Sequence, residues 1–297
     1  MSGNTGDLRR KIAGAGDLAS VVRSMKAYAA SSIGQYEKAV QSLDDYYRTV
    51  ELGLSACLRA AGDDSVAAKR PAASAAPAIG AILFGSDQGP VGRFNEVLLD
   101  FATETLAALP EGSRKIWAVG ERIRVLASDS GLPLAEPFSL PTSVHAITSL
   151  VGRLLIDIMA SRERGEVGEV YLFHNQPSVE TLYVPGAKRL LPLDQAWRIQ
   201  LRNLPWPGRL MPEVLGSEQA TLPALVRGYL FVLLFQACAE SLAGENASRL
   251  AAMQRAEKNI DGILEALNRR FHSLRQESID EELFDVISAF EAASAGP

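Results

Sequence analysis

The sequence is poor in the residue types that build metal, redox and covalent catalytic sites. Its 297 residues include two cysteines and three histidines. Cys57 and Cys238 lie far apart and fit no metal-ligand or redox spacing, so we expect two buried thiols in a reducing compartment. His145, His174 and His272 have no carboxylate or cysteine partner at ligand spacing, and the HxxH, HExxH and GxSxG motifs are absent. We therefore predict no metal site and no catalytic residue.

The chain also lacks an excess of positive charge and a long uncharged apolar run. Its net charge is -5 and its pI is about 5.4, which argues against nucleic-acid binding, because that needs a basic face. The most apolar stretch, 225–239, is shorter than a membrane span of about 18 residues and contains Arg227. The N-terminal MSGNTGDLRR has no signal-peptide core and no presequence pattern. We predict a soluble protein that reaches a membrane only through partners.

What the chain does have is a long helical pattern at each end. Apolar or small residues recur about every 3.5 positions from Leu8 to Leu54, which is the period of a coiled-coil seam. Several of these positions hold alanine, so the partner helix must come close. Gly14, Gly16 and Gly34 each weaken such a helix by up to ~1 kcal/mol relative to alanine. We expect one continuous helix here, stabilised by packing on a partner.

The second helical pattern runs through residues 217–292. Its apolar residues keep the same spacing from Met253 to Leu274 and are then displaced by one position. The displaced stripe consists of Ile279, Leu283, Val286 and Phe290. We interpret the displacement as a helix that leaves its partner near Leu274 and presents a new face to another protein.

Between these helices lie a linker and an α/β pattern. Residues 60–77 are rich in alanine and proline, and strand patterns then alternate with helix patterns. The expected strands are 78–85, 114–119, 169–173 and a returning strand in 181–191, and the expected helices are 94–108 and 143–161. We predict an α/β fold with a long antiparallel coiled coil of the N- and C-terminal helices and a central Rossmann-like α/β domain. The expected domains are 1–59, the linker 60–77, the globular domain 78–216 and 217–297.

A glycine-rich stretch, FGSDQGPVGRFN, follows the first expected strand at 84–95. It matches neither the Walker motif nor GxGxxG, Asp87 adds negative charge, and Pro90 removes an N–H donor. We therefore expect no phosphate and no cofactor here. The prediction is a structural turn set by Ser86 and Asp87, with glycines at positive φ and a helix that begins near Arg93.

Four stretches of the chain resemble the gamma subunit of the F-type ATP synthase. They are LRRKIAGAGDLASVVRSMKAYAAS at the N-terminus, the glycine-rich loop, SLAGENASRLAAMQRAEKN and LRQESIDEELFDVIS. The matching N-terminal residues are Ile12, Met25, Lys26, Ala29, Ala30 and Ser31. The matching loop residues are Asp87, Gly89, Gly92 and Asn95. The matching C-terminal residues are Arg275, Gln276, Ile279, Glu282 and Leu283.

The chain also departs from the family pattern at several positions. The departures are Val22, the segment 32–35, Gln88, residues 90–91 and Asp280. They indicate a divergent branch, such as the alternate F-type ATPases that some bacteria carry.

The resemblance implies a non-catalytic rotor shaft, or central stalk. Such a shaft couples ion flow through a membrane ring to ATP synthesis or hydrolysis at beta subunits. The implied partners are an alpha and beta hexamer, the epsilon subunit and the membrane c-ring. The implied location is peripheral, on the cytoplasmic face of the bacterial inner membrane.

Two sets of residues follow from the resemblance. The expected partner contacts are Met25, Lys26, Arg275, Gln276, Ile279, Asp280, Glu282 and Leu283. The expected structural loop residues are Ser86, Asp87, Gly89, Gly92 and Asn95. Met25 could instead be a seam residue only, and Arg275 and Gln276 could simply be solvated.

Two other functions remain open at this point. A coiled-coil adaptor with an α/β head has the same topology, and a nucleotide-dependent enzyme could use the α/β domain. The adaptor gives no reason for the loop and C-terminal motifs. Nucleotide titration of the isolated chain tests the enzyme, and we predict no binding.

Overall fold

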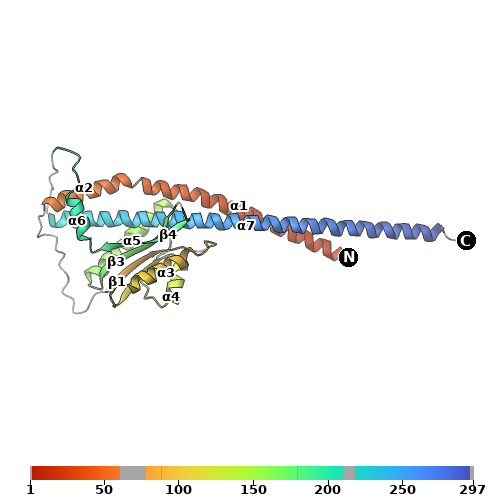
Figure 1. Cartoon of the computed structure of the whole chain (residues 1–297), viewed down its shortest axis with the longest axis horizontal. Coiled ribbons are helices and arrows are strands. Elements are labelled where there is room, and N and C mark those ends of the chain that lie inside the picture. The colour runs from red at the N-terminus through yellow and green to blue at the C-terminus, as the bar shows by residue number, and fades with distance from the viewer. Residues whose placement is uncertain (1, 61–77, 88, 179, 210–217, 295–297) are drawn as a thin grey trace. The chain divides into compact units, whose positions relative to one another are not determined.

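The computed structural model describes residues 2–60, 78–87, 89–178, 180–209 and 218–294. The chain divides into two compact units, one of Met1–Ala29 with Leu250–Pro297 and one of Ala30–Arg249. Two long helices, α1 (Ser2–Gln41) and α7 (Glu218–Ser294), contribute to both units (Figure 1). The predicted linker lies almost entirely outside the described residues, and the predicted domain boundaries stay a prediction.

The unit Ala30–Arg249 contains a four-stranded sheet. Its strands are β1 (Ala78–Phe84), β2 (Arg114–Val119), β3 (Val167–Pro177) and β4 (Tyr183–Leu191), in the order β2-β1-β3-β4. β1 pairs in parallel with β2 and β3, and β4 returns antiparallel to β3. The parallel centre and the returning strand are as predicted, although β3 is longer at both ends. The predicted α/β fold class is confirmed.

Helices cover both faces of this sheet, so β1 is buried on both sides. Ile79, Ala81 and Leu83 face a core formed with α3 (Phe94–Ala107) and α4 (Glu121–Asp129). Ile82 and Phe84 face the other core, formed with α5 (Val144–Glu163), α7 and α2 (Asp44–Ala60). Such a near-continuous apolar run is typical of a parallel strand covered on both faces.

The prediction of one continuous helix through residue 54 was wrong. α1 ends at Gln41 and α2 begins at Asp44. At the break, the Leu43 amide donates to the Val40 carbonyl and the Ser42 hydroxyl to the Ala39 carbonyl. Asp44 and Asp45 then favour a new helix, since acidic residues stabilise the first turn. The helix α6 (Gln195–Arg202), like α4, was also not predicted.

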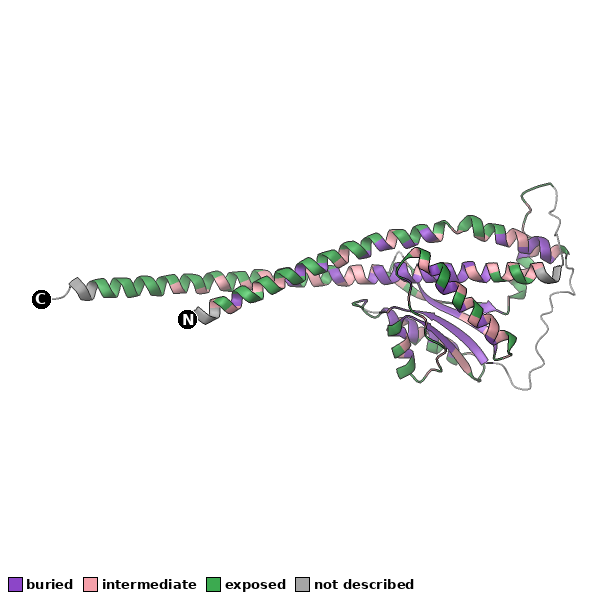
Figure 2. Cartoon of the chain, turned by 180° about the vertical axis from the view of Figure 1, so that it is seen from behind, coloured by how far each residue is buried: buried purple, intermediate pink, exposed green. Residues whose placement is uncertain are grey.

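The first unit is an antiparallel pairing of α1 with α7. Ala19 and Val22 of α1 pack against Met253 and Ile260 of α7, whereas Arg9, earlier in α1, lies 5.3 Å from the centre of the Phe271 ring. The contacts therefore run in opposite directions along the two helices. Figure 2 shows this narrow buried seam between exposed surfaces. The expected coiled coil is present, with small alanine side chains at its contact.

Two helical segments are long and apolar enough to cross a membrane by length and composition alone. They are Val144–Glu163 and Thr221–Phe290. α5 buries Ile147 and Leu154 in the core of the chain, and α7 buries Leu234 in the same core. Core helices of this kind pass the same test, so the finding is weak evidence for a membrane span.

Candidate partner-contact surfaces and the glycine loop

The glycine-rich loop begins with a buried polar pair. The Ser86 amide donates to Oδ1 of Asn95 at 2.8 Å, and Nδ2 of Asn95 donates to the Ser86 hydroxyl at 2.8 Å. Both residues are fully buried. Gly85 is required by space, because a Cβ there would lie 2.3 Å from Cβ of Ile123. These contacts tie the end of β1 to the start of α3.

Asp87 has a role in helix capping. Its Oδ1 accepts a hydrogen bond from the Glu121 amide at 2.9 Å, at the first residue of α4. An acidic side chain at this position satisfies a free N–H and interacts favourably with the helix dipole. Asp87 therefore caps a helix that begins more than thirty residues after it in the sequence.

The loop also rests on α7. Gly89 and Gly92 have φ values of 101° and 61°, a region that other residues adopt only with strain. The Ser248 hydroxyl donates to the Val91 carbonyl at 2.5 Å, and a Cβ at Gly89 would lie 3.7 Å from the Arg249 guanidinium. The amides of Gly85, Ser86 and Val91 all bond within the protein. This arrangement favours the structural turn over phosphate binding.

A buried ion pair lies beneath the loop. Arg249 Nη2 and Glu245 Oε1 are 2.5 Å apart, and Arg249 also donates to Oδ1 of Asn246. Burial raises the pKa of Glu245 to about 7, because Arg249 only partly offsets the desolvation and Asp87 adds repulsion. The sequence analysis did not single out these side chains. The signal was available in the GENASR stretch, where a glutamate and an arginine stand four residues apart on a helix.

The expected contacts Met25 and Lys26 lie on the seam of the coiled coil. Met25 is half-buried against the cluster formed by Ala19, Val22, Met253 and Ile260. Lys26 Nζ is 2.5 Å from Oε2 of Glu257, whose Oε1 accepts from Arg23 at 3.3 Å. The hydrogen bond from Lys26, with a smaller contribution from Arg23, lowers the pKa of Glu257. Both residues thus have contacts within the chain and still expose part of their surface.

The other expected contacts lie on the exposed C-terminal part of α7. Ile279, Leu283, Val286 and Phe290 are 53% to 74% exposed. At about 100° per residue they fall within an arc of about 60°, so they form one apolar stripe. Arg275 and Glu282 border one side of this stripe, and Gln276 and Asp280 border the other. We call Ile279, Leu283, Val286 and Phe290 with these four flanking residues the tip surface.

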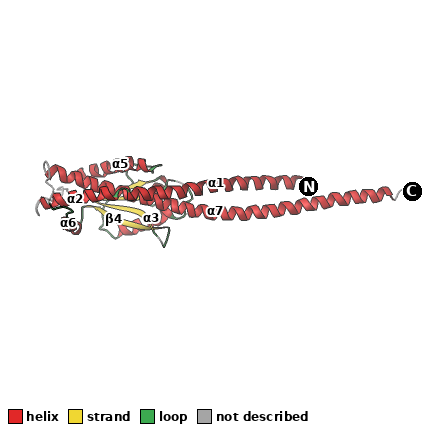
Figure 3. Cartoon of the chain, turned by 90° about the horizontal axis from the view of Figure 1, so that it is seen from above, coloured by secondary structure: helices red, strands yellow, loops and turns green. Residues whose placement is uncertain are grey.

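The tip surface lies beyond the seam. Arg9 contacts Phe271, and α1 begins seven residues before Arg9 at Ser2. Figure 3 shows the C-terminal end of α7 extending past the N-terminal end of α1. From residue 279 to 290 every side chain is exposed, so within the described chain nothing covers the stripe.

A second exposed apolar stripe, not predicted, lies beside the seam on α1. Leu18, Val21 and Tyr28 are each more than half exposed, with Met25 between them. Their spacing of three and four residues places them on one side of the helix. The sequence analysis missed this stripe because it followed only the alanine-rich seam, which lies one residue away along α1 and shares Met25 with the stripe.

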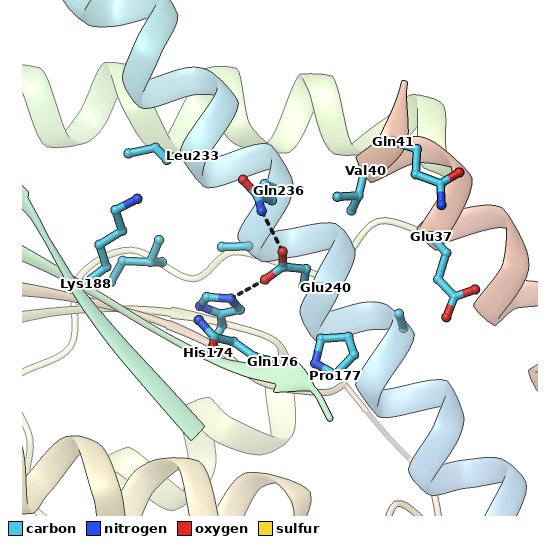
Figure 4. Close-up of a pocket in the computed structure, with 13 residues that line it drawn as sticks. Glu37, Val40, Gln41, His174, Gln176, Pro177, Lys188, Leu233, Gln236 and Glu240 are labelled. Atoms are coloured by element: carbon cyan, nitrogen blue, oxygen red, sulfur yellow. Dashed lines mark hydrogen bonds and ion pairs between the residues drawn. The ribbon is translucent and has the colours of Figure 1, made fainter. Parts of the chain in front are cut away.

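No carboxylate lies at ligand spacing from His174 in the sequence, but the fold brings one to it. Nε2 of His174 lies 2.8 Å from Oε2 of Glu240, so His174 does have a carboxylate partner (Figure 4). The partner is 66 residues away in sequence, which is why ligand spacing did not find it. Among the described residues no group of three or more His, Cys, Asp or Glu side chains could hold a metal ion. Cys57 and Cys238 are both buried thiols, as expected, and neither forms a disulfide.

Comparison with known proteins agrees with this arrangement. The sequence pattern of the ATP synthase family matches residues 4–293. The chain is 27% identical to the ATP synthase gamma chain of Syntrophus aciditrophicus, over 98% of each chain. It is 24% identical to the ATP synthase gamma chain of Frankia casuarinae, over 100% of each chain.

Solved structures share the fold. A chain of the Euglena gracilis mitochondrial ATP synthase, from a structure of its OSCP, F1 and c-ring, matches with a TM-score of 0.61 and 15% identity, over 100% of this chain and 96% of that one. A chain of the Tetrahymena thermophila mitochondrial ATP synthase, from its central stalk and c-ring, matches with a TM-score of 0.52 and 17% identity, over 80% and 99%. The resemblance does not support a coiled-coil adaptor unrelated to rotation. The chain belongs to the ATP synthase family, among its gamma chains.

Proposed function

We propose that this chain is the central rotor shaft of an F-type ATP synthase. In this role it carries no catalytic residue and couples ion flow through the membrane c-ring to ATP synthesis or hydrolysis at beta subunits. Its partners are the alpha and beta subunits, the epsilon subunit and the c-ring. It is peripheral at the cytoplasmic face of a bacterial inner membrane, and it reaches the membrane through these partners.

The tip surface is the observation that carries the proposal. A contiguous apolar stripe on a solvated helix is costly to leave in water, at about 25 cal/mol for each Å² exposed. Such a stripe has an apolar centre with Arg275, Gln276, Asp280 and Glu282 beside it, as protein interfaces have polar residues around an apolar core. The exposed Ile287 extends the apolar area on the side of Gln276 and Asp280. The alpha and beta hexamer is the partner we assign to it.

The shaft acts through unequal contacts. The two helices of the coiled coil present different side chains around their circumference, with Leu18, Val21 and Tyr28 on one side of α1. A ring of three equivalent catalytic sites would therefore meet three different surfaces. Because a ligand or partner shifts a conformational equilibrium only by binding its states differently, this asymmetry is what allows rotation to set each site's state.

Co-expression with the alpha and beta subunits of the same genome tests the proposal. The expected product contains one copy of this chain for three alpha and three beta subunits, and its ATPase activity depends on the chain. Mass measurement and an ATPase assay of the purified species read out both. A chain that stays alone, or forms only its own oligomers, would contradict the shaft function.

A second experiment tests the polar border of the tip surface. The double change Arg275→Ala with Gln276→Ala should weaken assembly or reduce ATP-driven ion pumping per ATP hydrolysed. The matched control is Arg269→Ala with Arg270→Ala, which removes exposed side chains of the same helix before the stripe begins. Unchanged pumping by the first variant would mean that Arg275 and Gln276 are only solvated.

A further inference from the structure

The coiled-coil unit changes the sign of its charge near residue 275. Residues 5–29 of α1 and 250–275 of α7 together contain ten lysine or arginine residues and five acidic residues. Residues 276–290 of α7 contain five acidic residues and no lysine or arginine. These acids, all exposed, are Glu277, Asp280, Glu281, Glu282 and Asp285. With histidine neutral, the net charge therefore changes from +5 along the seam to -5 at the tip.

The change of sign occurs where α1 no longer covers α7. Arg9 of α1 contacts Phe271, and α7 continues past the N-terminal end of α1 (Figure 3). The exposed apolar stripe of the tip surface begins at Ile279, only two residues after the first of the five acids. The apolar stripe and the acidic charge therefore belong to the same uncovered segment.

The acids surround the stripe on the helix. At about 100° per residue, the four stripe residues and Ile287 fall within an arc of about 100°. The five acids are spread over the rest of the circumference, and the exposed Phe284 lies among them. A protein that encloses this part of α7 would therefore contact both the apolar side chains and the carboxylates.

The acids are unfavourably placed in the isolated chain. Glu277 and Asp285 each stand four residues from Glu281, a spacing at which like charges destabilise a helix. The last turn of α7, where a cation would be favourable, has no basic residue. Within the part of the chain that the structure describes, none of the five acids forms an ion pair. A cationic partner would remove this repulsion.

The same acids restrict what can cover the stripe. Asp280 and Glu282 flank it on its two sides, so a protein that packs on the stripe also approaches their carboxylates. Removing a carboxylate from water without a counter-charge is costly, and a second anion opposite it would repel it. Lysine and arginine side chains avoid both costs, because they form charge-assisted hydrogen bonds with carboxylates.

We propose that the alpha and beta subunits surround the tip surface with an apolar sleeve bordered by lysine and arginine side chains. This inference rests on the proposed function, which assigns the hexamer to the tip surface, and it adds the chemistry of the partner. Exposed ion pairs contribute little affinity, so the cations act mainly by increasing the rate of association. The apolar stripe supplies most of the affinity.

The salt dependence of complex formation tests this inference. The purified chain is mixed with alpha and beta subunits of the same genome, and light scattering follows the formation of the complex. We expect the rate of association to fall about tenfold between ~50 and ~500 mM NaCl, because salt screens the charges that steer the encounter.

A variant with a neutralised tip separates this effect from other charges of the complex. Its four substitutions are Glu277→Gln, Asp280→Asn, Glu281→Gln and Glu282→Gln. It should associate about tenfold more slowly than the natural chain at ~50 mM NaCl, and at nearly the same rate at ~500 mM.

The matched control neutralises the same residue types at exposed positions of the unit Ala30–Arg249. Its substitutions are Glu104→Gln, Glu111→Gln, Asp129→Asn and Glu136→Gln. The control has the same net charge as the neutralised variant, and it should associate as the natural chain does.

A folding defect is distinguished by the isolated chains. Neutralising the tip removes repulsion between acids, so the helix content measured by circular dichroism should be unchanged or higher. Charge reversal by Asp280→Lys with Glu281→Lys should slow association further, again without loss of helix. Glu104→Lys with Glu111→Lys, the matched control, should associate normally.

The outcomes separate this inference from the proposed function. If the natural and neutralised chains form the complex at the same rate at ~50 mM NaCl, the cationic border is wrong and the shaft function is retained. If the natural chain forms no complex at any salt concentration, the shaft function is contradicted, and this inference with it.

Discussion

The glycine loop and the tip surface differ in where their contacts lie. In the loop, Ser86, Asp87 and Asn95 find their hydrogen-bond partners inside the chain. In the tip surface, Ile279, Leu283 and Phe290 are exposed, and no described residue covers them. Both regions resemble the same family over short motifs, yet the first makes its contacts within this chain and the second is the one we propose to bind a partner.

This difference separates motif residues that are bonded within the chain from motif residues that are open to a partner. Buried polar groups that are satisfied internally are expected to affect stability when changed. Exposed apolar groups without partners are expected to affect assembly and leave stability almost unchanged. The predictions below use that separation and run from the largest expected effect to the smallest.

The largest effect is expected at the tip surface. Leu283→Asp with Val286→Asp should weaken assembly with alpha and beta subunits at least ~100-fold, because each lost apolar contact is worth about 1.5–3 kcal/mol. The free energy of unfolding of the isolated chain should change by less than about 0.5 kcal/mol. Co-purification yield and urea unfolding measure the two quantities.

The control is Ile156→Asp, which places the same charge on an isoleucine that is 71% exposed in α5. It should assemble normally. Equal loss by both variants would show that added charge, and not the stripe, governs assembly.

The second prediction concerns the glycine-rich loop, where a substitution should lower the stability of the isolated chain. Gly85→Ala should lower the free energy of unfolding by about 3 kcal/mol, since its Cβ would lie 2.3 Å from Cβ of Ile123 and 2.7 Å from Oδ1 of Asn95. Gly152→Ala in α5 is the matched control, because nothing lies within 4 Å of its added Cβ. Urea unfolding measures the free energy of unfolding of both variants. Equal values for the two would contradict close packing at Gly85.

A helix or strand could be predicted from the sequence when the residues that stabilise it lie within it. The periodic patterns of β1, α3, β2, α5 and α7 were recognisable because each carries its own apolar face. α4 was not predicted, although Ile123 and Ala127 are buried one turn apart on it. What the local sequence does not contain is its cap, because the distant Asp87 carboxylate accepts from the Glu121 amide. A window that covers only the nine residues of α4 does not include Asp87.

α6 shows the same limit in part. Asp194 caps it by accepting from the Ala196 amide, a signal that the sequence does contain. Its position, however, comes from Trp197 packing on Tyr229, with ring centres 4.5 Å apart. The pair His174 and Glu240 was likewise unpredictable, since only the β3–α7 packing brings the two residues together.

The third prediction concerns the pH dependence of stability that comes from Glu245, beneath the glycine-rich loop. The pKa of Glu245 rises from 4.5 to about 7 in the folded chain, so between these pH values the folded state binds its proton more tightly. Stability from this group is present below about pH 4.5 and is lost as pH rises to about 7, by at most about 1.4 kcal/mol per pH unit. Glu245→Gln should remove that slope, measured as urea unfolding at a series of pH values. Glu265→Gln, exposed on α7, should retain it.

The smallest expected effect is on the stability of the coiled coil, at two glycines of α1. Gly14 and Gly16 lie within α1 at ordinary helical φ, and nothing lies within 4 Å of a Cβ added at either position. The fold therefore does not require glycine, and Gly14→Ala with Gly16→Ala should stabilise the isolated chain by up to ~2 kcal/mol in total. If the residues are small because an enclosing partner approaches closely, the same variant should assemble less well with alpha and beta subunits. If the variant is more stable but assembles less well, Gly14 and Gly16 lie on a surface that binds the alpha and beta subunits. If stability and assembly both rise, these glycines have no role in binding.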